Sequence, residues 1–451
     1  MRLDHRAIAW TAPRTGHDWT CPETARAVEW FRSVGGGPRL DARLDACRAF
    51  YESNRAAAED GLPVALFDPR DAVAWYILQA ETYATDRQFW TPDESARTVP
   101  YIRRLGQLYD RLARVNGVED RVARFVNGDP SQPDGSLYEL LVAGTWAERG
   151  YEVSFIPERP GVARTPDLNA TRGRSSWAVE TKRMMPSAYA RQEMEAGRRL
   201  AAHLHDLSEA LGHSVVVDVA YRRELTHYPN EFLAECVHDL LPISSPQLFD
   251  HDDARLFVRP VAWQLCRRVL ADDFVFIGST RMMEIIGGGH NHDLSHSLRA
   301  RCRRSPSRPS YADHVYHASL VNWACLSPAA HKAKAKHFNT KVADAEGQLP
   351  SDRPGVIHVG MESTGRPDAD LLRHYRNGHA ASLFTTGRSR LRWVYGNYFK
   401  IEATTRPNES LAMEETAVRY MISRHRTRDP LPNGLLLSDD HGVMRRGAYW
   451  D

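Results

Sequence analysis

The order of apolar patterns between residues 127 and 222 constrains the fold of this chain more than any other feature. A Gly- and Pro-rich loop opens the region, and alternating or helical periodicity follows it without long gaps. The elements expected in order are a helix at 136–149, strands at 151–156, 165–171 and 176–182, a helix at 188–211 and a strand at 213–221. Helix, three strands, helix and strand predict a layered α/β core.

The flanking segments divide the chain further. Residues 1–126 show apolar residues at three- and four-residue intervals and are predicted to form a helical N-terminal domain. The α/β domain is expected at 127–405, with an insertion at about 225–330 and a C-terminal extension at 406–451. Within it, the Gly-, His-, Arg- and Ser-rich segment 287–308 is expected to be a loop, and a late hairpin is expected at 391–403. A helix at 332–348 and a strand at 354–361 could join the same sheet.

Composition excludes several classes of protein. Hydrophobic residues make up 42% and charged residues 26%, which is ordinary for a soluble globular chain, and no stretch of 18 apolar residues suggests a membrane span. The N-terminus lacks the apolar core of a secretory signal, so a cytoplasmic location is expected. The six cysteines form no Cys-x-x-Cys pair, which argues against a zinc ribbon, a redox motif or a disulfide scaffold.

One of the few lysines lies in an informative setting. Only six of the 59 basic residues are lysines, and Lys182 ends the strand pattern 176–182 as part of Glu180-Thr181-Lys182. Residues i and i+2 of a strand share a face, so Glu180 and Lys182 should project together. If the strand that begins after Pro166-Asp167 pairs with this strand as a hairpin, Asp167 lies beside Glu180.

Two adjacent carboxylates repel each other, and a divalent cation would resolve the conflict. Oxygen ligands of this kind suit Mg²⁺ or Mn²⁺, which can activate water for attack on a phosphoryl group. Lys182 would stabilise charge in the transition state, and Glu139 from the preceding helix could complete the metal shell. The alternative for Glu139 is a capping box with Ser136.

A helix glutamate followed by Pro-Asp and then Glu-x-Lys resembles the PD-(D/E)XK superfamily of restriction-endonuclease-like nucleases. The resemblance covers about residues 127–222 and implies a mixed sheet flanked by helices. It makes Asp167 and Glu180 metal ligands, Lys182 the catalytic lysine and Glu139 the acid of the first helix. It also implies that the backbone carbonyl of Thr181 joins the metal shell.

The motif is short, so the prediction depends on the secondary-structure elements expected around it. Pro-Asp occurs at three other places in the chain, whereas the single Glu-x-Lys closes an apparent strand downstream of a Pro-Asp that opens another. The structural alternative is a strand-end ion pair between Glu180 and Lys182 or a neighbouring arginine.

A basic stretch at 297–341 contains four of the six lysines and one acid, Asp313. Such a stretch is typical of phosphate-backbone binding, and a solvated surface is the alternative. The residues predicted to contact nucleic acid are Arg301, Arg303, Arg304, Lys332, Lys334 and Lys336. His290, His292 and His296 could ligate zinc, but Asp293 directly follows His292 and breaks the His-x-His-x-Asp-His order, so a polar loop is the preferred interpretation.

These patterns together predict metal-dependent hydrolysis of nucleic-acid phosphodiester bonds, with Mg²⁺ or Mn²⁺ as cofactor. By analogy with the superfamily, the expected activity is that of a DNA endonuclease, and defence against foreign DNA is an associated role. The alternatives are a nucleic-acid-binding protein that does not cleave, an RNA nuclease, and a structural protein in which these residues form salt bridges. A homodimer or a partner subunit is left open.

Overall fold

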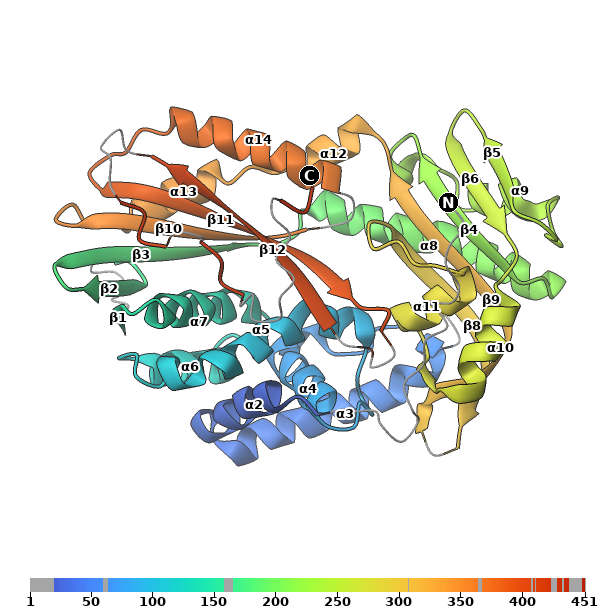
Figure 1. Cartoon of the computed structure of the whole chain (residues 1–451), viewed down its shortest axis with the longest axis horizontal. Helices are drawn as coiled ribbons and strands as arrows, with labels where there is room; N and C mark the ends of the chain where they lie inside the picture. The colour runs from blue at the N-terminus through green and yellow to red at the C-terminus, as the bar shows by residue number, and fades with distance from the viewer. Residues whose placement is uncertain are drawn as a thin grey trace.

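A computed structural model describes residues 20–59, 64–157, 165–306, 308–363, 367–406, 409, 411–422, 428–431, 434–437 and 448–450. The predicted α/β class is confirmed, because the chain folds into helices and two mixed β-sheets (Figure 1). None of the described helices is long and apolar enough to cross a membrane.

The described part of the N-terminal region, residues 20–59 and 64–127, is helical, as predicted. Its helices are α2 (Pro22–Gly35), α3 (Gly37–Glu59), η1 (Pro69–Asp71), α4 (Ala72–Ala84), α5 (Pro92–Leu112) and α6 (Val118–Asn127). Helix α4 is apolar around almost its whole circumference and is buried throughout, so it forms the centre of the helical layer. The Asp71 carboxylate caps its N-terminus by accepting from the Ala74 N–H.

The first sheet has six strands in the order β1-β2-β3-β10-β11-β12. They span β1 (Glu152–Phe155), β2 (Leu168–Arg172), β3 (Ser175–Met184), β10 (Pro354–Glu362), β11 (Arg390–Ala403) and β12 (Leu411–Met421). Strands β1, β2 and β3 form an antiparallel meander. Strand β10 is parallel to both β3 and β11, and β12 is antiparallel to β11.

Helices cover both faces of this sheet (Figure 1). One face packs on α5 and α7 (Pro133–Glu148), and the other packs on α13 (Asn339–Glu346), with α14 (Pro367–Leu383) beside it. Strand β3 shows the alternation directly, because Trp177 and Val179 enter the core shared with α7, whereas Ala178 packs with Phe338 beside α13. Glu180 and Lys182 continue the Ala178 face, since their partners on β10, Ile357 and Val359, belong to the same cluster.

The second sheet is built from the segment between β3 and β10. Its strand order is β5-β6-β4-β9-β7, with β8 also paired to β9. The strands are β4 (Val215–Tyr221), β5 (Gln247–Asp250), β6 (Ala254–Arg259), β7 (Val275–Phe276), β8 (Ser295–Ser305) and β9 (Arg308–Cys325). The helical segments around it are α8 (Ala188–Leu211), η2 (Leu225–His227), α9 (Phe232–His238), α10 (Trp263–Asp272), α11 (Thr280–Gly287) and α12 (Pro328–Lys334). Helix α8 covers one face, and α10 and α11 cover the other.

The observed organisation differs from the expected one in several respects. The strand expected at 213–221 lies in the second sheet, because β10 takes the place beside β3 and β4 pairs with β9 instead. The excursion therefore begins with α8, earlier than the insertion expected at about 225–330. The helical N-terminal region shares one hydrophobic core with the first sheet, and β12, from the expected extension at 406–451, is a strand of that sheet. The loop expected at 287–308 contains β8.

The expected addition of a later helix and strand to the first sheet is confirmed by α13 and β10. The first sheet therefore follows α7 with three antiparallel strands, and then adds α13 and the parallel strand β10. All six cysteines lie in the described residues and are free thiols. The hairpin expected at 391–403 is wrong, because this segment lies within the single strand β11.

Candidate active site

The β2–β3 hairpin brings Asp167 and Glu180 together. Leu168 pairs with Val179 in the antiparallel register, so Asp167, one residue before β2, lies opposite Glu180. The Asp167 N–H donates to Glu180 Oε2 at 3.2 Å. Asp167 Oδ2 accepts from the Thr181 N–H and the Thr181 hydroxyl, both at 2.8 Å. These contacts orient the Asp167 carboxylate, and its Oδ1 accepts no hydrogen bond from the described part of the chain.

Lys182 completes the group from the same strand and the same face. Its Nζ donates to Glu180 Oε1, so the two side chains are held together inside the site. The Glu180 side chain is 0% exposed, whereas that of Lys182 is 24% exposed. Lys182 is therefore the member of the pair that reaches solvent, and Glu180 is the member held beneath it.

The site is electrostatically strained without a cation. Burial raises the pKa of Glu180 to about 8, and the neighbouring Asp167 carboxylate adds to the rise. The Lys182 ammonium lowers this pKa but does not cancel the other two effects. At neutral pH Glu180 therefore retains a proton that an ordinary glutamate would have lost.

Glu139 lies near this group without joining it. It is on α7, where Arg121 Nη1 donates to its Oε2 at 2.9 Å. Arg121 Nη2 also donates to the Ile156 carbonyl at 3.3 Å, and the Ile156 N–H donates to the Asp167 carbonyl at 2.9 Å. Among the described residues, no group of three or more His, Cys, Asp or Glu side chains is arranged to hold a metal ion.

Asp167 and Glu180 nevertheless have the donor chemistry for Mg²⁺ or Mn²⁺. Both offer carboxylate oxygens, and Mg²⁺ commonly takes only one or two carboxylates and fills its remaining positions with water and phosphate oxygens. Asp167 Oδ1 and the oxygens of Glu180, once it has lost its proton, are the atoms that fit such an ion. Glu139 would contribute only if its ion pair with Arg121 opened.

The arginines predicted to bind nucleic acid lie on β8, at the second sheet. Arg301 pairs with Glu209 of α8, and Arg303 Nε donates to Asp313 at 2.7 Å, although both arginine side chains remain largely exposed. Burial lowers the pKa of Arg304, and the nearby Arg55 lowers it further. The basic stretch 297–341 could not reveal this pairing by itself, because Glu209 belongs to α8, outside that stretch.

The three predicted lysines have different surroundings. Lys332 and Lys336 are exposed, at α12 and just after it. Lys334 is buried, and its Nζ donates to Glu193 of α8 at 2.5 Å. Lys334 therefore joins two helices and is not available to a phosphate backbone.

The three histidines form a compact cluster of rings. The rings of His290 and His292 are 4.5 Å apart, and those of His290 and His296 are 5.7 Å apart. Asp293 accepts from Lys400 Nζ at 2.6 Å, so the carboxylate nearest in sequence is already paired. These three histidines are not among any metal-holding group of the described residues.

A buried ionic network behind the site was missed by sequence reasoning. Arg183 faces α5 and donates to Glu362 at 3.3 Å and to the Tyr101 hydroxyl at 3.2 Å. Arg97 of α5 donates to both oxygens of Glu362 at 3.1 Å. The network joins α5, β3 and β10. Arg183 directly follows Lys182 on β3, and neighbouring residues of a strand point to opposite faces, so the sequence itself indicated that Arg183 points away from Lys182.

No protein-family model, curated protein or solved structure matches this chain.

Proposed function

We propose that this protein is a metal-dependent nuclease of the PD-(D/E)XK type that hydrolyses phosphodiester bonds, with DNA as the preferred substrate class. The observation that carries the proposal is the convergence of Asp167, Glu180 and Lys182, with Glu180 fully buried beside a second carboxylate. A salt bridge alone does not account for the second acid, because Lys182 already pairs with Glu180. The sequence order of α7, three strands, α13 and β10 supports the same proposal.

Asp167 and Glu180 would hold the ion, and Thr181 keeps the Asp167 carboxylate in a fixed orientation through two hydrogen bonds. Bound Mg²⁺ would polarise a phosphoryl oxygen and acidify an attacking water. Once Glu180 has an additional cationic partner, the Lys182 ammonium can turn toward solvent and donate to the charge that develops on the phosphoryl group. The partial exposure of its side chain supports this role, because an incoming substrate could reach the ammonium.

A cleavage assay with defined metals tests the proposal. Plasmid, linear duplex, single-stranded DNA and RNA are incubated with Mg²⁺, Mn²⁺ or EDTA, and cleavage of DNA is expected only with a divalent cation. Equal cleavage in EDTA would overturn the metal mechanism. Binding without cleavage under every condition would favour the non-cleaving alternative, and cleavage of RNA alone would favour the RNA nuclease.

Substitution of Lys182 assigns the chemistry to this site. Lys182→Ala should lower the cleavage rate about 10²–10³-fold, the usual effect of losing one electrostatic contact to a transition state. Lys182→Arg should restore little, because a planar guanidinium does not replace a compact ammonium. Asp167→Ala should also lose Mn²⁺ affinity, measured by calorimetry.

Lys400→Ala is the matched control, since Lys400 is also paired with an acid, Asp293, but lies outside the site. It should cleave at the wild-type rate. If Lys182→Ala also cleaves at the wild-type rate, Glu180 and Lys182 form only a strand-end ion pair.

A further inference from the structure

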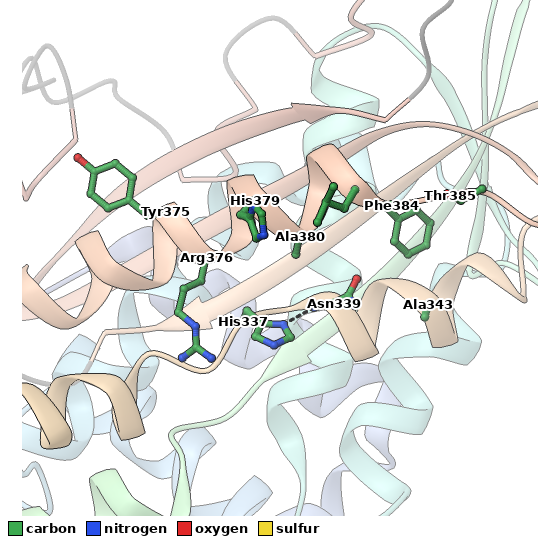
Figure 2. A pocket seen from close by; sticks show the side chains of 10 residues that line it. His337, Asn339, Ala343, Tyr375, Arg376, His379, Ala380, Phe384 and Thr385 are labelled. Atoms are coloured by element: carbon green, nitrogen blue, oxygen red, sulfur yellow. Dashed lines mark hydrogen bonds between the residues drawn. The ribbon is translucent and has the colours of Figure 1, made fainter.

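A surface groove lies between α13 and α14, on the side of the first sheet toward which Glu180 and Lys182 project. Its volume is about 780 Å³. His337, Asn339 and Ala343 line one side, and residues of α14 and the turn after it line the other (Figure 2). Figure 2 shows Arg376 beside His337 at one end and Phe384 toward the other.

The groove is basic. Arg376 Nη1 donates to the carbonyls of Ala335 at 2.7 Å and Lys332 at 3.3 Å, which fixes the guanidinium at the end of α12. His337 and His379 also line the groove, and no Asp or Glu is among its described lining residues.

Three further cations lie on the α12 and α13 segments, close in sequence to the lining residues His337, Asn339 and Ala343. Lys332, Lys336 and Lys341 are exposed, and within the described residues none of them forms an ion pair with an acid. Glu346, also on α13, is occupied by the N–H groups of Gly387 and Ser389. Asp344 is exposed on α13 three residues after Lys341, and Lys332, Lys336 and Lys341 form no ion pair within the described residues, unlike Arg301 and Arg303 on β8.

Large apolar and aromatic groups are exposed among these cations. The Tyr375 residue is 65% exposed and the Leu383 residue is 68% exposed, both on α14. Phe384 is partly buried at the end of the groove. Unpaired cations beside exposed rings form the combination that binds a flexible polyanion with planar bases, because phosphates contact the cations and bases stack on the rings.

We propose that the α13–α14 groove binds a single-stranded segment of nucleic acid. A duplex presents its phosphates outward and keeps its bases stacked inside, so it could use the lysines but not Tyr375. The inference rests on the proposed nuclease function for its substrate class, and it adds that the strand is unpaired where it contacts this surface. The groove and the Lys182 side chain lie on the same side of the first sheet. Nucleic acid bound in the groove would therefore lie on the face of the molecule that carries the proposed cleavage site.

Binding measured in EDTA separates this inference from the cleavage chemistry. A fluorescein-labelled 20-nucleotide oligothymidylate and a 20-base-pair duplex are titrated with the full chain, and binding is followed by anisotropy. The single strand should bind at least tenfold more tightly than the duplex. Tyr375→Ala should weaken single-strand binding about tenfold, in the range measured for loss of one stacking contact.

Tyr316→Ala is the matched control. Tyr316 is 60% exposed, lies on β9 of the second sheet, and contacts the His314 ring, as Tyr375 contacts the His374 ring. It should leave binding unchanged. The double substitution Lys336→Ala and Lys341→Ala should reduce the salt dependence of single-strand binding by about 1.4 in log–log slope, at about 0.7 per lost phosphate contact.

Three results would overturn the inference. They are duplex binding as tight as single-strand binding, equal effects of Tyr375→Ala and Tyr316→Ala, and polyglutamate competing as well as the unlabelled oligonucleotide. Each of these would leave the nuclease proposal standing if the protein still cleaves DNA with Mg²⁺. Conversely, single-strand binding that depends on the groove residues, without cleavage under any condition, would support the groove as a binding site and overturn the nuclease proposal.

Discussion

Replacing Glu180 by glutamine should stabilise the metal-free protein while removing its metal site. Glu180 is fully buried, and its pKa is about 8 instead of the ordinary 4.5. Folding therefore keeps a proton on Glu180 that the unfolded chain releases above pH 4.5. At pH 7 this difference costs the wild-type protein about 3 kcal/mol of stability, at about 1.36 kcal/mol per pKa unit.

An opposing effect reduces the gain. Glu180 Oε2 accepts from the Asp167 N–H, and one of the two side-chain oxygens becomes an NH₂ group in the variant. Loss of one acceptor costs about 1 kcal/mol. The net stabilisation expected for Glu180→Gln is therefore about 2 kcal/mol at pH 7.

The pH dependence identifies the cause. The folded pKa of Glu180 is raised, so its carboxyl costs the wild-type protein nothing below pH 4.5, and the cost grows as pH rises toward 8. The two proteins should have similar stability near pH 5, and the variant should be more stable by about 2 kcal/mol at pH 7 and about 3 kcal/mol at pH 8. Urea unfolding in EDTA, followed by tryptophan fluorescence at pH 5, 6, 7 and 8, measures this difference.

Added Mn²⁺ provides the functional control. It should raise the stability of the wild-type protein and leave Glu180→Gln unchanged, because only the wild type retains both carboxylates. A stability difference that stays constant from pH 5 to 8, or a variant less stable than wild type at pH 8, would refute the reasoning.

Two further predictions concern buried charge away from the site. Glu362→Gln should destabilise the protein by about 3–5 kcal/mol in urea unfolding, because Arg97 and Arg183 lose their shared buried carboxylate; a loss below about 1 kcal/mol would show that solvent reaches the network. Burial lowers the pKa of His358 to about 3, so the unfolded chain binds a proton below pH 6.5 that the folded protein does not. The stability of His358→Gln relative to wild type should therefore improve by about 1.4 kcal/mol per pH unit as pH falls from 6.5 to 5, and a constant difference would contradict the assigned pKa.

The site hairpin was predictable because its determinants are local. Strands β2 and β3 are joined by Gly173 and Arg174, and Gly173 has a φ of 59°, which a glycine adopts without strain. The short turn sets the register, and the register sets which residues are opposite each other. The pairing of Asp167 with Glu180 therefore follows from a segment of the chain that is continuous in sequence.

The neighbour of β3 on its other side was not predictable in the same way. Two apolar runs, at 213–221 and 354–361, could each have supplied a parallel strand, and consecutive strands are usually neighbours. The nearer run pairs with β9 instead, and the chain completes a second sheet before β10 returns to β3. Which of two buried parallel strands lies beside β3 depends on tertiary packing that periodicity does not encode.

Strand β8 shows how composition can hide periodicity. Its Gly-, His-, Arg- and Ser-rich surroundings indicated a loop, yet Leu298, Ala300 and Cys302 alternate with arginines and pack on the core beneath α10 and α11. Arg299 and Arg301 face α8, where Asp206 and Glu209 neutralise them. The acids came from a segment about 90 residues earlier in the chain, so a local count overstated the free positive charge.

The β3 register places two groups of buried ionisable residues on opposite faces of one strand. Glu180 and Lys182 face α13, and Arg183 faces α5 with Glu362. A shift of one residue in the pairing would exchange these faces, placing Glu180 and Lys182 on the side of α5 and α7 and Arg183 on the side of α13. The ion pairs of Arg97 and Arg183 with Glu362 form in the observed register, so they favour the pairing in which Glu180 meets Asp167. The buried arginines thus contribute to the site through the register of the strand, and their own side chains need not contact substrate.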